Sequence, residues 1–394
     1  MGSPHGRLTL VASVSQILQQ YGQQYLDRHG EHLTVDQRKT LQAVMACRTG
    51  ALGTIRYQCL TCGHVHQVPR SCANRHCPTC QYEKTCQWLE TQQSRLLPCA
   101  YFLITFTVPQ ELRALMLCHP RKGYRALMNA AADALKTAAS NERHVGRGTP
   151  GFLGVLHTFG RDLTYHPHVH FIVAGGAVDS DAVQGARWKP SRTDYFVPEK
   201  VLSILFRAKL CDALKQAGLL TGLAAEVWQR GFTVDAINVG DGRASLKYLS
   251  PYVFRGPVSN WRVTACNNGA SLDDATLVLQ VKPSGKGHHR PMRLPVEEFI
   301  RRWLLHVLPG GFHRVRYYGF LHSHSKVSVA EVCWLIALHN DDLYYLTCRV
   351  TLVTASLSGG MRCSRCGGRM ISLGYFPPLW YLVSIPRAPP NVVG

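Results

Sequence analysis

Acidic residues and long apolar segments are both scarce in this sequence of 394 residues. Charged residues make up only 17% of the chain, and Asp and Glu number 24 against 44 Lys and Arg. No stretch approaches the roughly 18 consecutive apolar residues that a membrane-spanning helix needs, so we expect no membrane partner. The first ten residues contain one arginine and no apolar run typical of a secretion signal. These absences predict a cytoplasmic protein with reduced thiols.

The excess of basic residues gives the chain a formal net charge of +20, with its histidines counted as neutral. The lysines and arginines are scattered through segments with a folded composition and do not follow one basic amphipathic helix. This distribution favours a nucleic acid over a membrane surface as the polyanionic partner. We therefore expect a nucleoid-associated protein, with a basic surface that has no partner as the alternative.

Chain length and composition predict two or three domains around a sizeable core. Strand-like and helix-like patterns are mixed without a βαβ repeat, so the predicted fold class is α+β. We expect a zinc-knuckle domain over residues 1–97, an α+β domain over residues 98–325 and a C-terminal region over residues 326–394. Strands are predicted over residues 101–108, 152–159, 168–174, 261–266 and 276–282, and helices over residues 124–139, 198–217 and 295–308.

Fifteen cysteines in a reducing compartment indicate metal binding before disulfides, and seven of them lie within residues 47–86. Cys59 and Cys62 form one CxxC motif, and Cys77 and Cys80 form a second one after fourteen intervening residues. Each motif offers two sulfur ligands from one tight turn, and a tetrahedral Zn²⁺ needs four. The spacing therefore predicts one structural zinc ion held by all four thiolates. Buried cysteines without metal are the alternative.

The donors left over in the same region predict a second zinc ion. Its candidate ligands are Cys47, Cys72, His76 and either His64 or His66. The sequence alone does not determine which of these ligands share an ion.

A third CxxC motif, formed by Cys363 and Cys366, lies near the C-terminal end. It predicts a C-terminal zinc knuckle if Cys333 or Cys348 comes close enough to complete the ligand set. Free thiols are the alternative.

Three histidines occur within five residues in a segment that ends at His170. Side chains alternate along a strand, so His168 and His170 point the same way and can bind one metal ion. A third ligand is expected from His157 on the preceding strand, with His166 as the competing candidate. Histidines on a solvated strand face are the alternative without a metal.

Two tyrosines, Tyr248 and Tyr252, are spaced so that they share one face of a helix. Taken alone, two tyrosines at this spacing are more often packing residues than nucleophiles. Pro251 lies between them and has no N–H to donate to the carbonyl of Lys247. The helix is therefore expected either to begin near Ser250 or to be kinked there.

Four groups of residues follow one another along residues 30–325, and together they are more specific than any one of them. They are SCANRHCPTC over residues 71–80, LHT with HPHVH over residues 156–158 and 166–170, KYLSPYVFR over residues 247–255, and EEFIRRWLLHVLP over residues 297–309. In this order the chain resembles the rolling-circle transposases of the insertion-sequence ninety-one family. These are HUH-type two-tyrosine transposases, related to Helitron and plasmid replication-initiation proteins.

The resemblance implies a role for each motif. His168 and His170 match the HUH pair, and Tyr248 and Tyr252 match the tyrosine pair. The cysteine-rich region matches the family's zinc-binding DNA-recognition module. The implied catalytic fold is an HUH endonuclease domain with a central antiparallel sheet flanked by helices.

A tyrosine is a poor nucleophile toward phosphate at neutral pH, because a phenol has a pKa of about 10 and is mostly protonated. A cation that binds the scissile phosphate favours the phenolate, and Mg²⁺ or Mn²⁺ is the expected ion. Lys247 could assist Tyr248 with its own charge. Attack by either tyrosine would leave a 5′-phosphotyrosine and a free 3′-hydroxyl, which can rejoin DNA without ATP.

The expected substrate is single-stranded DNA at element ends and target, with Arg75 and Arg255 as candidate DNA-binding residues. No GxxxxGK[ST] motif occurs in the sequence. A host helicase or the replication machinery is therefore expected to separate the strands. Two alternatives are a plasmid-type rolling-circle replication initiator and a non-catalytic, zinc-dependent DNA-binding protein.

Overall fold

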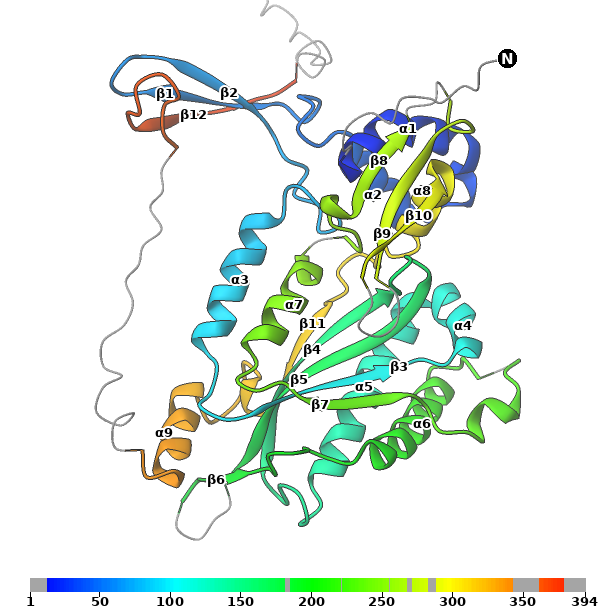
Figure 1. The fold of residues 1–394 in the computed structure, drawn as a ribbon, viewed down its shortest axis with the longest axis vertical. Coiled ribbons are helices and arrows are strands. Elements are labelled where there is room, and N and C mark those ends of the chain that lie inside the picture. The colour runs from blue at the N-terminus through cyan, green and yellow to red at the C-terminus, as the bar shows by residue number, and fades with distance from the viewer. Residues whose placement is uncertain are drawn as a thin grey trace, which may run out of the picture.

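A central antiparallel sheet organises the chain in the computed structural model (Figure 1). The structure describes residues 13–180, 185–220, 222–254, 256–267, 271–282, 288–342 and 361–378. The strands follow the order β11-β4-β5-β3-β7, and β6 pairs with β5. Their bounds are β3 (Tyr101–Thr107), β4 (Thr149–Phe159), β5 (Tyr165–Asp179), β6 (Arg187–Pro190), β7 (Val234–Asn238) and β11 (Val315–Tyr318).

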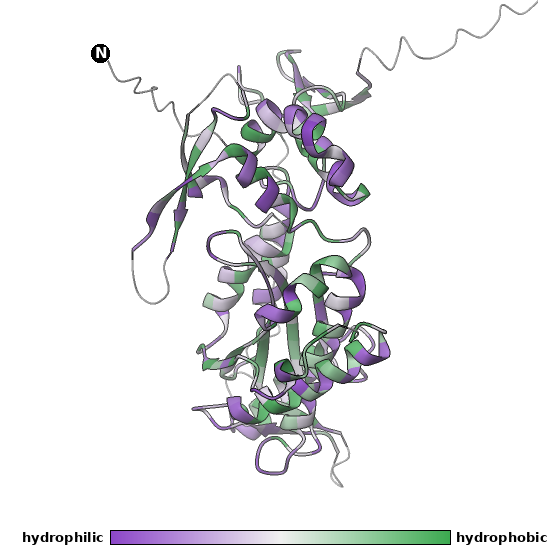
Figure 2. Ribbon diagram, turned by 90° about the vertical axis from the view of Figure 1, so that its right-hand side faces the viewer, coloured by the Kyte–Doolittle hydropathy of each residue, from purple (hydrophilic) through white to green (hydrophobic). Residues whose placement is uncertain are grey.

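Alternating apolar side chains bury both faces of this sheet. On one face, Phe102, Ile104 and Phe106 of β3 belong to the same core as α5 (Pro120–Ala139) and α6 (Glu199–Gln216). The short helix α4 (Arg113–Cys118) leads into α5. In Figure 2 the strands of the central sheet are coloured mainly as hydrophobic, which fits their position between layers of helices.

The opposite face of the sheet is covered by three helices from different parts of the chain. Leu153 and Ile172 share a core with α7 (Arg243–Phe254), α3 (Tyr82–Ser94) and α9 (Val329–His339). Helices therefore flank the antiparallel sheet on both faces, which confirms the predicted α+β class.

A second body lies beyond one end of the sheet and joins the start of the chain to a later segment (Figure 1). Helices α1 (Val14–His29) and α2 (Val35–Met45) share a core with a three-stranded sheet and helix α8 (Val296–Leu304). The sheet has the order β10-β9-β8 and consists of β8 (Val263–Asn267), β9 (Thr276–Val281) and β10 (Arg290–Pro295).

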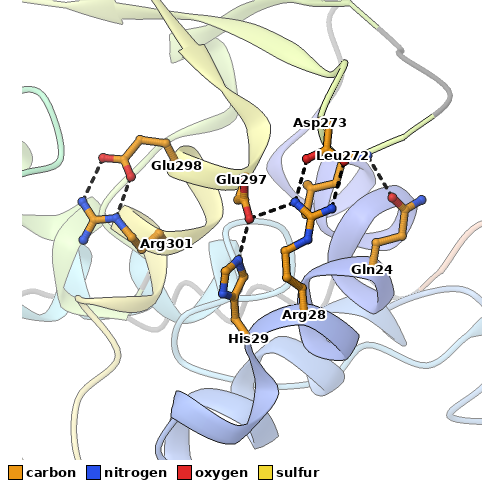
Figure 3. Close-up of polar contacts among 8 residues, drawn as sticks. All are labelled: Gln24, Arg28, His29, Leu272, Asp273, Glu297, Glu298 and Arg301. Carbon is orange, nitrogen blue, oxygen red and sulfur yellow. Dashed lines mark hydrogen bonds and ion pairs between the residues drawn. The ribbon is translucent and has the colours of Figure 1, made fainter.

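Polar contacts border this apolar core where α1 meets α8 and the segment before β9 (Figure 3). Arg28 of α1 contacts Asp273 at 2.7 Å and Glu297 at 3.2 Å, and His29 contacts the same Glu297 at 2.5 Å. Because these ion pairs are largely exposed to solvent and salt screens such pairs, the buried apolar side chains, such as Trp303, dominate the stability of this body.

The third body is a small sheet that we call the ribbon sheet, with the order β12-β1-β2. It consists of β1 (Thr54–Cys59), β2 (Val65–Pro69) and β12 (Met370–Phe376). Thr54 of β1 lies opposite Phe376 of β12. Segments from near the two ends of the chain therefore form one structural unit.

Within the described ranges, no helix combines the length and the apolar character needed to cross a bilayer.

Candidate active site and cysteine clusters

Three histidines converge at one end of the central sheet, on the face that α7 covers. His157 of β4 lies opposite His168 of β5, and His170 follows on the same side of β5. The ring centroids of His157 and His170 are 4.7 Å apart, and those of His168 and His170 are 4.8 Å apart. One ligand nitrogen from each ring lies within 4.8 Å of the other two. We call these residues the histidine cluster; His166 is not part of it.

Hydrogen bonds orient the imidazole rings of the histidine cluster. Nδ1 of His168 lies 2.7 Å from the carbonyl oxygen of His166, and Nδ1 of His170 lies 2.8 Å from Oγ1 of Thr105. Both contacts leave Nε2 available for a metal ion. Nε2 of His157 is buried and has no hydrogen-bond partner among the described residues. A buried nitrogen without a partner, between two imidazoles, fits a metal ligand.

Burial keeps these imidazoles neutral. It lowers the pKa of His157 and His168 well below the usual value, with a further contribution from neighbouring imidazole charge. Burial also lowers the pKa of His170 to about 4. At neutral pH the three rings can therefore bind a divalent cation without first losing a proton.

Helix α7 places both tyrosines beside the histidine cluster. Its apolar side, including Leu249, is buried against the sheet, while the ring centroids of Tyr248 and Tyr252 lie 6.0 Å apart. The Tyr252 ring is 5.1 Å from that of His157, and the Tyr248 ring is 6.4 Å from that of His170. Both phenols therefore border the position where the three imidazoles converge.

The two tyrosines differ in their surroundings. Tyr248 is 56% exposed, whereas Tyr252 is half-buried. Burial raises the pKa of the Tyr252 phenol, the Tyr248 phenol adds to this effect, and the Arg262 charge opposes it. Tyr248 is thus the more accessible phenol, and Tyr252 lies deeper beside the imidazoles.

Pro251 lies inside α7, which extends from Arg243 to Phe254. The alternative that the helix begins near Ser250 is therefore wrong. Oγ of Ser250 donates to the carbonyl oxygen of Lys247 at 3.1 Å, in place of the N–H that proline lacks. Lys247 itself is exposed.

Three residues around the site were missed by the sequence analysis: Thr105, Arg262 and Arg314. Arg314 donates to the carbonyl oxygen of Tyr252 at 2.5 Å, and burial lowers its pKa to about 9. Arg262 lies close enough to Tyr252 for its charge to affect the phenol. A strand register could have placed Thr105 opposite His170, but no local motif marks either arginine.

The cysteines form two clusters whose membership corrects the predicted pairing. One contains Cys47, Cys72, Cys77 and Cys80, and we call it the helix-side cluster. The other, the ribbon cluster, contains Cys59, Cys62, Cys363 and Cys366. The prediction that the first two CxxC motifs share an ion is wrong, because β1 and β2 carry the first motif away from the second.

The C-terminal CxxC motif completes the ribbon cluster because β12 pairs with β1. Sγ of Cys59 lies 3.5 Å from that of Cys366, and Sγ of Cys62 lies 3.7 Å from that of Cys363. Cys333 belongs to α9 and is instead buried in the core between this helix and the central sheet. Cys348 lies outside the described residues.

Each cluster has the donor set of a structural zinc site, since four thiolates suit a tetrahedral Zn²⁺. In the helix-side cluster, Sγ of Cys72 is 3.6 Å from that of Cys80 and Sγ of Cys77 is 3.8 Å from that of Cys47.

The other predicted zinc ligands lie outside these clusters. His76 is buried, and its Nε2 accepts from the backbone N–H of Leu308 at 3.3 Å. His66 is exposed on β2, opposite Tyr57. His64 is half-buried just before β2 and is not a member of either cluster. Neither cluster therefore contains a histidine.

Of the two candidate DNA-binding arginines, the structure describes only Arg75. The guanidinium of Arg75 donates to the carbonyl oxygens of Leu308, Pro309 and Phe312. These hydrogen bonds hold the loop after α8, and the DNA contact of Arg75 stays a prediction. Arg255 lies outside the described residues.

Comparisons with known proteins agree with this arrangement. The transposase zinc-binding domain of the IS91 type matches residues 17–108, and a second family, described as putative transposase, matches residues 151–328. A curated transposase that is 35% identical over 81% of this chain supports the same assignment. The protein is therefore a transposase, and DNA is its partner. The chain belongs to the insertion-sequence ninety-one (IS91) family.

Two curated relatives cover most of the chain. The putative transposase y4qJ of Sinorhizobium fredii is 35% identical over 341 residues, 81% of this chain and 83% of the relative. The transposase for insertion sequence element IS801 of Pseudomonas savastanoi pv. phaseolicola is 29% identical over 299 residues, 72% of this chain and 70% of the relative.

Among solved structures, the conjugative relaxase TrwC in complex with mutant OriT DNA is similar over 29% of this chain and 44% of its own. The two are 19% identical with a TM-score of 0.22, which is too low to support a statement on function.

The two cysteine clusters lead to a prediction for zinc content. The purified protein should retain two Zn²⁺ per chain after weakly bound ions are removed. Cys363→Ser should retain one Zn²⁺ per chain. The helices outside the ribbon sheet should stay folded, because the ribbon sheet has its own small core. Cys77→Ser should also leave one but destabilise the N-terminal helices, because Cys77 lies in their core. Metal analysis and circular dichroism measure both effects.

The matched control is Cys211→Ser, a half-buried cysteine of α6 outside both clusters, which should keep two ions. Two ions retained by Cys363→Ser would contradict the ribbon cluster.

Proposed function

We propose that this transposase nicks and rejoins single-stranded DNA at element ends through a 5′-phosphotyrosine intermediate and so drives rolling-circle transposition. The observation that carries the proposal is the placement of two phenols from one helix beside three buried imidazoles. Tyr248 and Tyr252 both border the histidine cluster. A purely structural zinc-dependent binding protein has no need for this arrangement.

The chemistry begins with one tyrosine. The phenolate oxygen attacks the phosphorus of a phosphodiester, a new P–O bond forms, and the bond to the 3′-oxygen breaks. The departing oxygen takes up a proton and becomes a free 3′-hydroxyl, while the 5′-phosphate stays on the tyrosine. Since one ester replaces another, a 3′-hydroxyl can reverse the step without ATP.

His157, His168 and His170 would hold the divalent cation that such a step requires. Mg²⁺ or Mn²⁺ bound there would offset the charge of the scissile phosphate and favour the phenolate. The neutral state of the imidazoles at physiological pH supports this assignment. Exposed Lys247 is proposed to assist Tyr248 in the first cleavage.

DNA recognition is proposed to involve the ribbon sheet and the adjoining cysteine motifs. Residues 48–72 and 361–378 contain six arginines and no acidic residue. The positive charge of these segments attracts phosphate groups, and no carboxylate is present to repel them. Because the sequence has no P-loop motif, we propose that a host helicase or the replication machinery separates the strands.

A denaturing gel tests the proposed function. With Mg²⁺ or Mn²⁺, the protein should convert a single-stranded oligonucleotide from an element end into a covalent protein–DNA adduct. A 3′-end label should migrate with the protein, because the 5′-phosphate of the downstream fragment is the linked group. A 5′-end label should appear on a shortened free strand. No adduct, or an adduct that carries the 5′ label, would contradict the proposal.

A further inference from the structure

We propose that Trp261 and Arg262 form a nucleotide subsite beside Tyr252, in which Arg262 binds a phosphate of single-stranded DNA and Trp261 stacks on an adjoining base. This subsite rests on the proposed function, because it holds the strand on which the tyrosines act.

Arg262 is fixed at the junction between the active site and the second body. It follows α7 in the chain and lies at the end of a short 3₁₀ segment, Asn260–Arg262. Its Nε donates to the carbonyl oxygen of Gln280 at 2.9 Å, and Nη2 donates to the carbonyl oxygen of Arg161. These contacts connect β9 to the turn between β4 and β5, the strands that carry the histidine cluster.

The charge of Arg262 remains available to a phosphate. Both carbonyl partners are neutral, so they hold the group without cancelling its charge, and they use only part of its five N–H donors. The turn that Arg262 contacts directly follows Phe159, whose ring centroid lies 5.2 Å from that of Tyr252. A phosphate next to the one under attack would meet a positive charge with unused N–H donors here.

Trp261 presents a large aromatic surface next to this charge. Its side chain is 60% exposed, and its ring meets that of His289 edge-on, with centroids 5.3 Å apart. The preceding residue, Asn260, accepts a hydrogen bond from the backbone N–H of Val14 at 3.1 Å. The indole is thus exposed on an anchored segment, which suits a stacking platform for a base.

The neighbouring charges favour a nucleic acid over a protein as the occupant. Strand β10 begins with Arg290, which directly follows His289 and is exposed. His289, in contact with the indole, is exposed as well. An aromatic ring bordered by cationic side chains is the combination that single-stranded DNA requires.

Binding and photo-crosslinking test the subsite without cleavage. The probe is a single-stranded oligonucleotide with 5-iodouracil at successive positions around the cut site. Trp261→Ala should bind it about ten-fold more weakly, as expected for the loss of one stacked base, and should lose the crosslink at one position. Trp261→Phe keeps a ring and should retain most of the affinity. Trp334→Ala removes an equally exposed tryptophan (56%) on α9 and should bind like wild type.

Arg262 is tested by cleavage and by the same binding assay. Arg262→Gln should slow adduct formation about 100-fold, whereas Arg262→Lys should recover part of the rate because it restores the charge. Arg125→Gln changes an exposed arginine on α5, beyond the opposite face of the sheet, and should have the wild-type rate.

The outcomes separate this inference from the proposed function. If wild type forms no adduct but Trp261→Ala loses binding and the crosslink, the proposed chemistry fails and the subsite remains. If wild type forms the adduct, and Trp261→Ala binds and crosslinks like Trp334→Ala, the subsite is wrong and the proposed chemistry remains.

Discussion

Replacing either His168 or His170 by alanine should reduce strand cleavage at least about 10³-fold and change DNA affinity by less than about two-fold. A bound cation contributes several kcal/mol to phosphate chemistry, and each 1.36 kcal/mol is a factor of ten in rate. DNA affinity depends on many phosphate contacts spread over a basic surface, so the loss of one metal ligand affects it little. Single-turnover cleavage and filter binding at fixed salt measure the two quantities.

His166→Ala provides a matched control two residues away. Its imidazole lies outside the histidine cluster, although its carbonyl oxygen contacts His168. Because alanine keeps that carbonyl, the variant should cleave at close to the wild-type rate. Electron paramagnetic resonance of Mn²⁺ without DNA should show weaker binding in His168→Ala and unchanged binding in His166→Ala. Equal Mn²⁺ affinity in wild type and His168→Ala would contradict metal binding by the histidine cluster.

The histidine cluster shows what local periodicity can predict. Alternation along one strand places His168 and His170 on the same side, and a short connection to the preceding strand makes His157 a reachable neighbour. The observed register places His157 opposite His168. The choice of His157 over His166 depended on the register of two strands, which a short motif does not specify.

The cysteine clusters show where the same reasoning ends. Two CxxC motifs fourteen residues apart satisfy the ligand count of one zinc ion, so nothing local favours a partner 300 residues away. The ribbon cluster exists because β12 pairs with β1 and brings Cys363 to Cys62. Such a long-range strand pairing leaves no mark in the spacing of either motif.

The N-terminal helices illustrate a second long-range effect. Composition marks a cysteine-rich segment near the start of the chain, but the apolar side of α1 is buried against α8 and β9. Arg28 meets Asp273 across 245 residues of sequence. The composition of the chain can locate the N-terminal segment, but it does not indicate which later segments pack against that segment's apolar side.

The tyrosine pair leads to the prediction with the clearest mechanistic content. Tyr248→Phe and Tyr252→Phe should each prevent complete transposition, and at least one of them should still form a covalent adduct with a single-stranded end. Phenylalanine keeps the ring and its packing and removes only the attacking oxygen. The double variant should form no adduct.

Their different exposure indicates separate tasks. We expect Tyr248 to make the first cut, because it is the more exposed phenol and follows Lys247 directly. Tyr252, deeper and close to His157, would then cut the second site while the first strand remains attached to Tyr248. Under this order, Tyr252→Phe keeps adduct formation and Tyr248→Phe loses most of it.

A Tyr195→Phe variant is the matched control, because this half-buried ring contacts His144, away from the histidine cluster. It should support both adduct formation and transposition at the wild-type level. Full transposition by either single variant of the pair would reduce the mechanism to one tyrosine. Adduct formation by the double variant would show that a group other than these two phenols attacks the phosphodiester.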